Sequence, residues 1–214
     1  MSRPVTVVDY GIGNLYSVTR ALEVCGASVR LTASHEHIED AERVVLPGVG
    51  AFEDGMKGMA ERSQAEPVRR FIESGRPFLG ICVGMQLLLE VGEEFGEHAG
   101  LGILPGRVAA IPATGADGRP HRIPHIGWNV LRPPEHGRDW SGSILADLPA
   151  EPAVYFVHSF APVPTQESSR LADCHYDGRR VSAAIRAGNT YGCQFHPEKS
   201  GPVGLRILRN FLAI

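Results

Sequence analysis

Cysteine is scarce in this 214-residue chain, which has four cysteines and no Cys-x-x-Cys pair. The four stand far apart, at positions 25, 82, 174 and 193. Disulfide frameworks and structural zinc sites need cysteines in closer groups, so the sequence argues against either. We therefore expect reduced cysteines, a cytoplasmic location, and neither a bound metal nor another cofactor.

Long apolar runs and a strong charge of one sign are also lacking. No apolar segment approaches the roughly 20 residues that cross a bilayer, and residues 1–8 show no signal-peptide pattern. The formal net charge of −3 gives no electrostatic reason to expect nucleic acid or a membrane surface as a partner. Repeats, low-complexity tracts and linkers are absent as well, which predicts a single domain over residues 1–214.

The first third of the chain alternates between strand-like and helix-like segments. Asn14 and Ser34 are suited to cap helices at their first turn, and Gly26 is suited to end one. The strand-like segments are continuously apolar, as in a parallel sheet covered on both faces. The predicted strands are residues 5–8, 27–31 and 43–46, and the predicted helices are residues 15–25, 35–41 and 66–74.

The second half is richer in turn signals. Loops are predicted over residues 112–124 and 133–152, the second with a short helix near 144–148. Because turns separate the last strands, we expect antiparallel additions to the sheet. The predicted strands are residues 102–111, 126–131, 154–158, 171–175 and 181–185, followed by a helix over 202–212. The fold class is thus α/β, with a mostly parallel central sheet, helices on both faces and added antiparallel strands.

A turn containing Gly11 and Gly13 follows the first strand and invites a dinucleotide-binding interpretation. That fingerprint needs a third glycine for close packing of helix on strand, and Tyr16 occupies its position. We reject a dinucleotide site.

A candidate nucleophile stands within residues 76–89. An apolar run predicts a buried strand, Cys82 has Gly80 and Gly84 two residues to either side, and a helical pattern continues through Leu89. This is the layout of a nucleophile elbow, in which small residues let strand, turn and helix approach closely. The helix start supplies N–H groups and positive potential that favour a thiolate. The alternative is that Cys82 packs in the core, as most free cysteines do.

A candidate base and a candidate ligand loop lie elsewhere. A β-type run ends at His196, and Glu198 follows after a proline, which is a suitable pair to activate a thiol. The alternative is that this turn only closes a strand and caps the last helix. Residues 47–50 (Pro-Gly-Val-Gly) form a loop at the carboxyl end of a strand, where ligands bind in α/β sheets, although a simple turn is the commoner outcome.

The chain resembles the class I (triad) glutamine amidotransferases and, more narrowly, the family of glutaminase subunits of imidazole glycerol phosphate synthase. The resemblance covers essentially the whole chain. The general motifs are residues 80–86 (GICVGMQ), 47–50 (PGVG) and 194–198 (QFHPE). The narrower family is indicated by residues 9–14 (DYGIGN), 124–129 (PHIGWN), 155–160 (YFVHSF) and 199–200 (KS).

The resemblance implies a flavodoxin-like amidotransferase fold and thioester chemistry on L-glutamine. It implies Cys82 as the nucleophile, His196 as the acid and base, and Glu198 as the group that orients His196. It also implies an oxyanion hole of backbone N–H groups, and a glycine loop that reorients to complete it. The implied oxyanion-hole residues are Val49 and Val83, and the implied glutamine-binding residues are Gly50, Gln86, His158, Ser159 and Phe160.

The narrower family also implies a partner. Its glutaminase subunit forms a heterodimer with a cyclase subunit of (β/α)₈ barrel fold, which receives ammonia and makes imidazole glycerol phosphate and aminoimidazole carboxamide ribonucleotide. Asn14, Tyr155 and Lys199 match interface positions that relay the presence of the nucleotide, although each is equally an ordinary polar surface residue. Two alternatives remain: a glutaminase of another pathway, such as pyridoxal phosphate synthesis, and a catalytically silent regulatory module.

Overall fold

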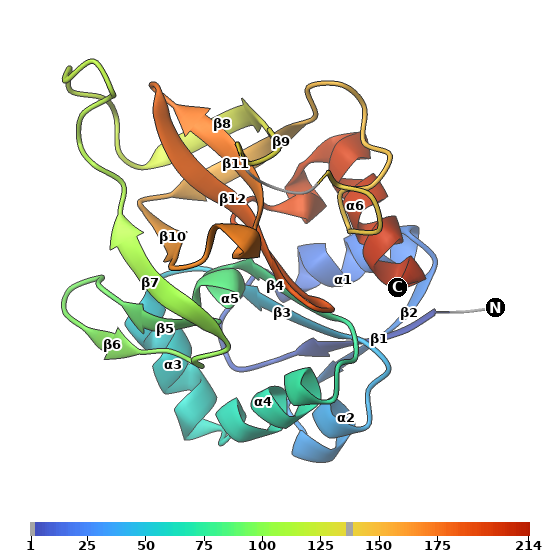
Figure 1. Cartoon of the computed structure of the whole chain (residues 1–214). Helices are drawn as coiled ribbons and strands as arrows, with labels where there is room; N and C mark the ends of the chain where they lie inside the picture. The colour runs from blue at the N-terminus through green and yellow to red at the C-terminus, as the bar shows by residue number, and fades with distance from the viewer. Residues whose placement is uncertain (1–2, 136–138) are drawn as a thin grey trace.

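The computed structural model describes residues 3–135 and 139–214 (Figure 1). Residues 1, 2 and 136–138 lie outside it, so one end of the predicted 1–214 domain and part of the predicted 133–152 loop are not described. The single-domain organisation stays a prediction.

A seven-stranded sheet forms the centre, in the order β11-β12-β13-β4-β3-β1-β2. The pairs from β13 to β2 are parallel, whereas β11, β12 and β13 pair antiparallel, which confirms the predicted fold class. Its strands are β1 (Arg3–Val8), β2 (Ala27–Thr32), β3 (Val44–Gly48), β4 (Phe78–Cys82), β11 (Arg170–Tyr176), β12 (Arg179–Ala187) and β13 (Thr190–Cys193).

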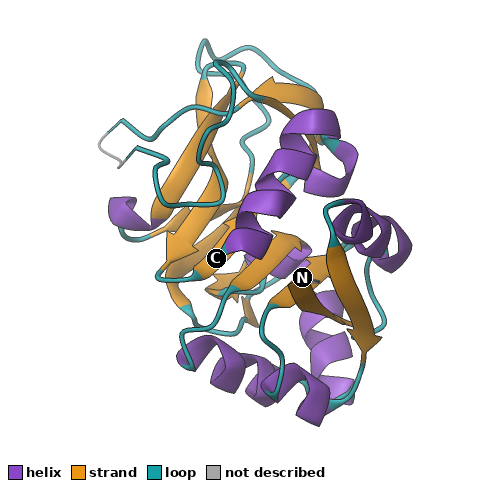
Figure 2. Cartoon of the chain, turned by 90° about the vertical axis from the view of Figure 1, so that its right-hand side faces the viewer, coloured by secondary structure: helices purple, strands orange, loops and turns teal. Residues whose placement is uncertain are grey.

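Two helical layers cover this sheet (Figures 1 and 2). One layer contains α1 (Leu15–Val24) and α6 (Gly201–Ala213), and the other contains α2 (His35–Glu39), α3 (Phe52–Glu61) and α4 (Ala65–Glu73). The predicted caps are confirmed, since Asn14 accepts a hydrogen bond from the Ser17 N–H and Ser34 from the His37 N–H.

Other strands of the second half form separate layers. The order β10-β7-β5-β6 makes a four-stranded sheet, and β8 with β9 makes an antiparallel two-stranded ribbon. The prediction that residues 154–158 extend the central sheet is therefore wrong, because among the described residues β9 pairs with β8 alone. These strands are β5 (Leu89–Gly92), β6 (His98–Ala99), β7 (Leu104–Ala110), β8 (His125–Val130), β9 (Ala153–His158) and β10 (Phe160–Pro164).

Helix α3 was not predicted, because its two internal glycines are poor helix formers. Packing requires Gly58, because a Cβ there would lie 2.6 Å from the Tyr10 carbonyl oxygen, whereas one on Gly55 would lie 3.1 Å from the end of the Leu87 side chain, a tight contact with a side chain that can move. The predicted helix near residues 144–148 is wrong, since this segment is a series of turns. The 3₁₀ turns are η1 (Glu167–Ser169) and η2 (Pro197–Lys199).

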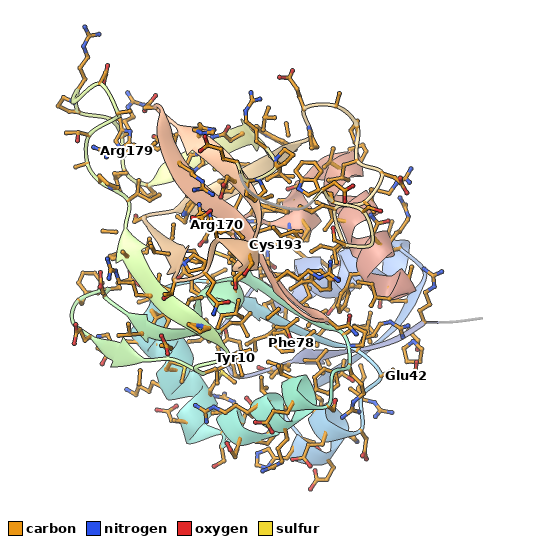
Figure 3. The ribbon with its side chains drawn as sticks, viewed as in Figure 1. Tyr10, Glu42, Phe78, Arg170, Arg179 and Cys193 are labelled. Atoms are coloured by element: carbon orange, nitrogen blue, oxygen red, sulfur yellow. The ribbon has the colours of Figure 1, made fainter. Side chains whose placement is uncertain are left out.

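The core lies between the layers, where Phe78 of β4 and Cys193 of β13 are completely buried on neighbouring strands (Figure 3). Arg179, by contrast, lies among the second-half strands away from this core (Figure 3). Among the described residues, no helix is long and apolar enough to cross a membrane.

Candidate active site

Cys82 is the last residue of β4, and it lies beside Gly48, the last residue of β3, in the parallel register. Its backbone has φ 55° and ψ −112°, a left-handed φ that costs a non-glycine residue free energy. Gly80 and Gly84 make this turn possible: a Cβ on Gly84 would lie 1.9 Å from the Leu46 carbonyl oxygen, and one on Gly80 would lie 2.5 Å from the Gly84 carbonyl oxygen. The elbow geometry predicted from the sequence is confirmed.

The helix after the elbow is shorter than predicted. It is α5 (Val83–Gln86), and Leu89 already begins strand β5. An apolar run of this length is compatible with either a helix or a buried strand. Leu89 adopts the strand because it pairs with Leu104 of β7. A helix of one turn carries little macrodipole, so its contribution to a thiolate or an oxyanion is mainly its local N–H groups, beginning with that of Val83.

His196 and Glu198 form a buried pair beyond the end of β13. Strand β13 ends at Cys193, so the predicted strand through His196 is too long. The His196 N–H donates to the Tyr155 carbonyl oxygen of β9, which holds the residue outside the central sheet. Its Nδ1 lies 2.7 Å from Glu198 Oε1, and both side chains are at most 3% exposed.

The charge state of His196 follows from its neighbours. Burial lowers its pKa, but hydrogen bonds to Cys82 and Glu198, together with the charges of both groups, outweigh burial and raise the pKa to about 9. These neighbours favour the protonated form of His196, whose ring lies between a sulfur and a carboxylate. This is the charge distribution that a thiolate nucleophile needs.

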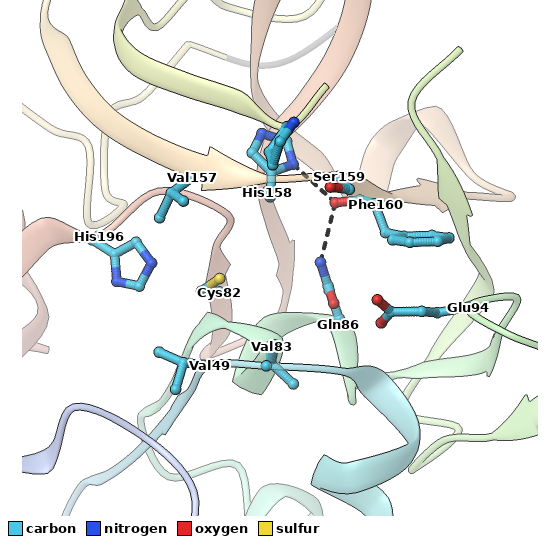
Figure 4. Close-up of a pocket in the computed structure, with 12 residues that line it drawn as sticks. Val49, Cys82, Val83, Gln86, Glu94, Val157, His158, Ser159, Phe160 and His196 are labelled. Atoms are coloured by element: carbon cyan, nitrogen blue, oxygen red, sulfur yellow. Dashed lines mark hydrogen bonds between the residues drawn. The ribbon is translucent and has the colours of Figure 1, made fainter. Parts of the chain in front are cut away.

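A cavity of about 260 Å³ opens above the elbow (Figure 4). Cys82 and His196 face each other across one end of it, and Gln86 and Phe160 lie at the other (Figure 4). The predicted residues that line it are Val49, Gly50, Cys82, Val83, Gln86, His158, Ser159, Phe160 and His196. The structure thus brings every predicted glutamine-binding residue into one cavity with Cys82, the predicted nucleophile.

Gln86 joins two parts of the cavity wall. Its Nε2 donates to the Phe160 carbonyl oxygen at 3.1 Å and to Gln194 Oε1 at 3.0 Å. The same Phe160 carbonyl accepts from His158 Nδ1 at 2.8 Å. These bonds fix the carbonyl oxygen of Phe160 in the wall of the cavity, where Figure 4 shows it between Gln86 and His158.

The glycine loop is shorter than predicted, because Pro47 and Gly48 belong to β3. Gly48 has no room for a side chain, because a Cβ there would lie 2.6 Å from the Gly84 nitrogen and 2.6 Å from the Tyr10 hydroxyl oxygen. Val49 is 39% exposed, and Gly50 has φ +88° with open space around its Cα. The Val49–Gly50 part of the motif thus lies beyond the strand and is less tightly packed than Gly48.

The three predicted interface residues lie outside this cavity. Asn14 is half-buried and caps α1, Tyr155 is half-buried with its ring 6.2 Å from that of Trp128, and Lys199 is exposed at the end of η2. The interface role of these three residues stays a prediction, because a position at the surface does not show what a residue contacts.

The sequence interpretation missed Glu94, Pro124 and Val157, which also line the cavity. Glu94 follows strand β5, and its Oε2 accepts from the Phe52 N–H at 2.9 Å, which caps α3. No periodic pattern marks such a residue, because a hairpin brings it to the site. Within the described residues, no three His, Cys, Asp or Glu side chains are close enough to hold a metal ion.

Comparison with known proteins gives consistent matches. The family model described as "Glutamine amidotransferase class-I" matches residues 6–214. "Imidazole glycerol phosphate synthase subunit HisH 1" of Legionella pneumophila (strain Lens) is 54% identical, covering 98% of this chain and 99% of that protein. The HisH subunit of Syntrophotalea carbinolica is 45% identical, with coverage of 97% and 98%. The solved structure of PurLQS from Thermotoga maritima has a TM-score of 0.73 at 20% identity, covering 100% and 99%, and shows likeness of fold alone.

Proposed function

The chain belongs to the class I glutamine amidotransferases, and on that premise we propose that Cys82, His196 and Glu198 form a catalytic triad that hydrolyses L-glutamine. The observation that carries this proposal is the cavity in which a strained cysteine faces the buried His196–Glu198 pair. The fold alone does not define a reaction, whereas these three groups do.

The first half of the reaction forms a thioester. The Cys82 thiolate attacks the side-chain amide carbon of glutamine, and the carbonyl oxygen becomes an oxyanion. The His196 imidazolium donates its proton to the amide nitrogen, the carbon–nitrogen bond breaks, and ammonia leaves. Glu198 holds the imidazole ring in place and stabilises its positive charge.

The second half releases glutamate. Neutral His196 takes a proton from water, hydroxide attacks the thioester carbon, and the Cys82 thiolate leaves with His196 again protonated. The Val83 N–H at the start of α5 and the Val49 N–H of the glycine loop are the proposed oxyanion donors. Loss of one such donor typically costs about 10²–10³ in rate, so the loop conformation controls the activity.

The far end of the cavity suits the amino-acid part of the substrate. The Glu94 carboxylate is placed to pair with the α-ammonium of glutamine, and charge-assisted hydrogen bonds of this kind are the stronger ones. Gly50, Gln86 and the segment from His158 to Phe160 surround the rest of the molecule. A cavity of about 260 Å³ is near the lower end of the range for small-molecule sites, as expected for one amino acid.

The enzyme is the glutaminase subunit of imidazole glycerol phosphate synthase. Relatives at 44–54% identity that carry this name span nearly the whole chain, and they support this pathway over another glutaminase. The partner is a cyclase subunit of (β/α)₈ barrel fold, which receives the ammonia. The exposed Ile126 and Trp128 of the β8–β9 ribbon, 57% and 59% exposed, lie near Tyr155 and belong to the proposed docking face together with Asn14 and Lys199.

Replacement of the nucleophile tests this function. We expect Cys82→Ala to lower glutamate release by at least about 10³-fold while binding to the cyclase is retained. Cys25→Ala is the matched control, because Cys25 is a half-buried free cysteine that follows α1, does not line the cavity, and has its Sγ 3.4 Å from the Leu205 carbonyl oxygen. Glutamate release is measured with and without the cyclase and its nucleotide substrate. A Cys82→Ala variant with the wild-type rate would contradict the triad, and a wild-type chain that the cyclase does not stimulate would contradict the pathway.

A further inference from the structure

The side chain of Gln194 is completely buried against the nucleophile, and the reaction described above does not use it. Its Nε2 lies 3.7 Å from Cys82 Sγ, within hydrogen-bond distance for sulfur, and its Oε1 accepts from Gln86. An amide buried at this depth is expected to have partners for its polar atoms. Here one of those partners is the reacting atom.

The orientation of Gln194 is set by a chain of hydrogen bonds that begins at the Phe160 carbonyl. A carbonyl oxygen only accepts, so the Gln86 atom that faces it must be the NH₂ group. The second hydrogen of that NH₂ group points to Gln194, which must therefore present its oxygen to Gln86. The NH₂ group of Gln194 is left to face Cys82.

The same carbonyl fixes two histidine tautomers on its other side. His158 Nδ1 faces the Phe160 oxygen and must carry a proton, so Nε2 of the neutral ring accepts. His125 Nδ1 lies 3.0 Å from that Nε2 and must donate to it. His125 Nε2 then accepts from the Asn129 side-chain NH₂ at 3.4 Å. Asn129 is oriented independently, since its oxygen accepts from the Val130 N–H and its NH₂ group donates to the His175 carbonyl oxygen.

The surroundings of His125 and His158 favour the neutral form of both rings, and the chain of hydrogen bonds needs that form. Burial lowers the pKa of His158 to about 3 and that of His125 to about 4. The His125 ring is stacked between Phe156 and Tyr176, with centroid distances of 4.8 and 4.2 Å.

We propose that Gln194 is a further catalytic residue, whose side-chain N–H stabilises the Cys82 thiolate, and that Asn129, His125 and His158 are positioning residues that hold in place the Phe160 carbonyl oxygen, from which Gln86 and then Gln194 take their orientation. The chain runs from the β8–β9 ribbon to the nucleophile without a break. The inference rests on the proposed function only in taking Cys82 as the nucleophile.

The rate at which Cys82 is alkylated tests the role of Gln194. Iodoacetamide reacts with the thiolate, and the modified Cys82 peptide is quantified by mass spectrometry over pH 5–9 in the full-length chain. Gln194→Met keeps the length of the side chain and removes the donor, and we expect alkylation about tenfold slower at pH 7, with the pH profile displaced toward alkaline pH. Gln64→Met is the matched control, because Gln64 is equally buried but donates to the Asp9 and Ala33 carbonyls instead.

Equal alkylation rates in Gln194→Met and Gln64→Met overturn the role of Gln194. His125→Phe keeps the stacking and breaks the chain, so we expect a displacement of the profile in the same direction, and an unchanged profile overturns the positioning role. If the alkylation rates of Gln194→Met and Gln64→Met are equal while the wild type shows normal cyclase-stimulated glutamate release, this inference fails and the proposed function stands. A wild type that shows the predicted alkylation behaviour but hydrolyses no glutamine contradicts the proposed function alone.

Nuclear magnetic resonance of the unaltered protein provides a measurement that does not depend on a folded variant. At pH 7 we expect His125 and His158 to be neutral with the proton on Nδ1, and the Gln194 side-chain NH₂ signals to shift when Cys82 is alkylated. An Nε2–H tautomer or an imidazolium at either histidine overturns the chain, and unmoved Gln194 signals overturn its contact with the sulfur.

Discussion

Cys82 and His196 show how single residues are given unusual chemistry by their surroundings. A left-handed backbone lifts the sulfur out of the sheet, and the neighbouring sulfur and carboxylate hold a proton on an imidazole that burial alone would deprive of it. Burial thus lowers the pKa of His196, and the hydrogen bonds and charges of its neighbours raise the pKa by more. The raised pKa depends on both Cys82 and Glu198, and water cannot take the place of the Glu198 carboxylate because that side chain is only 1% exposed.

Replacement of Glu198 by glutamine removes that charge and keeps the shape. We expect the pKa of His196 to fall from about 9 toward its ordinary value near 6.5 and thioester formation to slow by roughly 10²–10⁴-fold. A titration of the His196 ring by nuclear magnetic resonance and single-turnover kinetics measure the two effects. Glu73→Gln at the exposed end of α4 is the control. A His196 titration that is unchanged in Glu198→Gln would remove Glu198 from the triad.

At the scale of elements, the strand–turn–helix unit of β4 and α5 depends on backbone packing without side chains. Gly84 lies directly against the Leu46 carbonyl of β3, so a methyl group has no space. We expect Gly84→Ala to destabilise the fold by about 1–3 kcal/mol and to lower glutaminase activity further than that loss explains. Urea unfolding and steady-state kinetics measure the two quantities.

Gly26→Asn is the control for this prediction. Gly26 ends α1 with φ +90° and has open space around it, and asparagine tolerates that conformation. A Gly84→Ala variant that matches Gly26→Asn in both stability and activity would show that the elbow has room to relax.

Sequence predicted these elements where the signal is local. Asn14 and Gly26 bound α1 because capping involves neighbouring backbone groups, and Gly80 and Gly84 mark the elbow because its spacing is fixed. Where contacts between distant residues determine the secondary structure, prediction from the sequence was wrong or absent. Leu89 is in a strand because it pairs with Leu104. Helix α3 contains Gly58 because a larger residue there would clash with the Tyr10 carbonyl oxygen. The direction of Gln194 is invisible in the sequence, since it depends on contacts with residues far along the chain.

For the whole molecule, the buried histidines set how stability depends on pH. His125 and His158 have folded-state pKa values of about 4 and 3, below the ordinary 6.5, so they favour the folded state above pH 6.5 and this stability is lost as the pH falls toward those values. His196 has a raised pKa of about 9, so its contribution is complete below pH 6.5 and is lost as the pH rises through 9.

We therefore expect the free energy of unfolding to be highest near pH 6.5 and to fall on both sides, with a limiting slope of about 1.4 kcal/mol per pH unit for each histidine. Urea unfolding at pH 4.5, 6.5 and 9 measures this dependence. The His125→Phe variant removes one titrating group, so its stability falls less steeply on the acid side. A wild-type stability that does not change between pH 6.5 and 4.5 would contradict the neutral state of the two histidines.

Helix α6 has a practical consequence for handling the protein. It begins two residues after Lys199, next to the His196–Glu198 turn, and its 13 residues extend about 20 Å at the usual rise of an α-helix. The helix therefore separates the His196–Glu198 turn from residue 214 by about that length. A spectroscopic label placed at residue 214 therefore lies about 20 Å from the His196–Glu198 turn, a distance suited to measurements between the two.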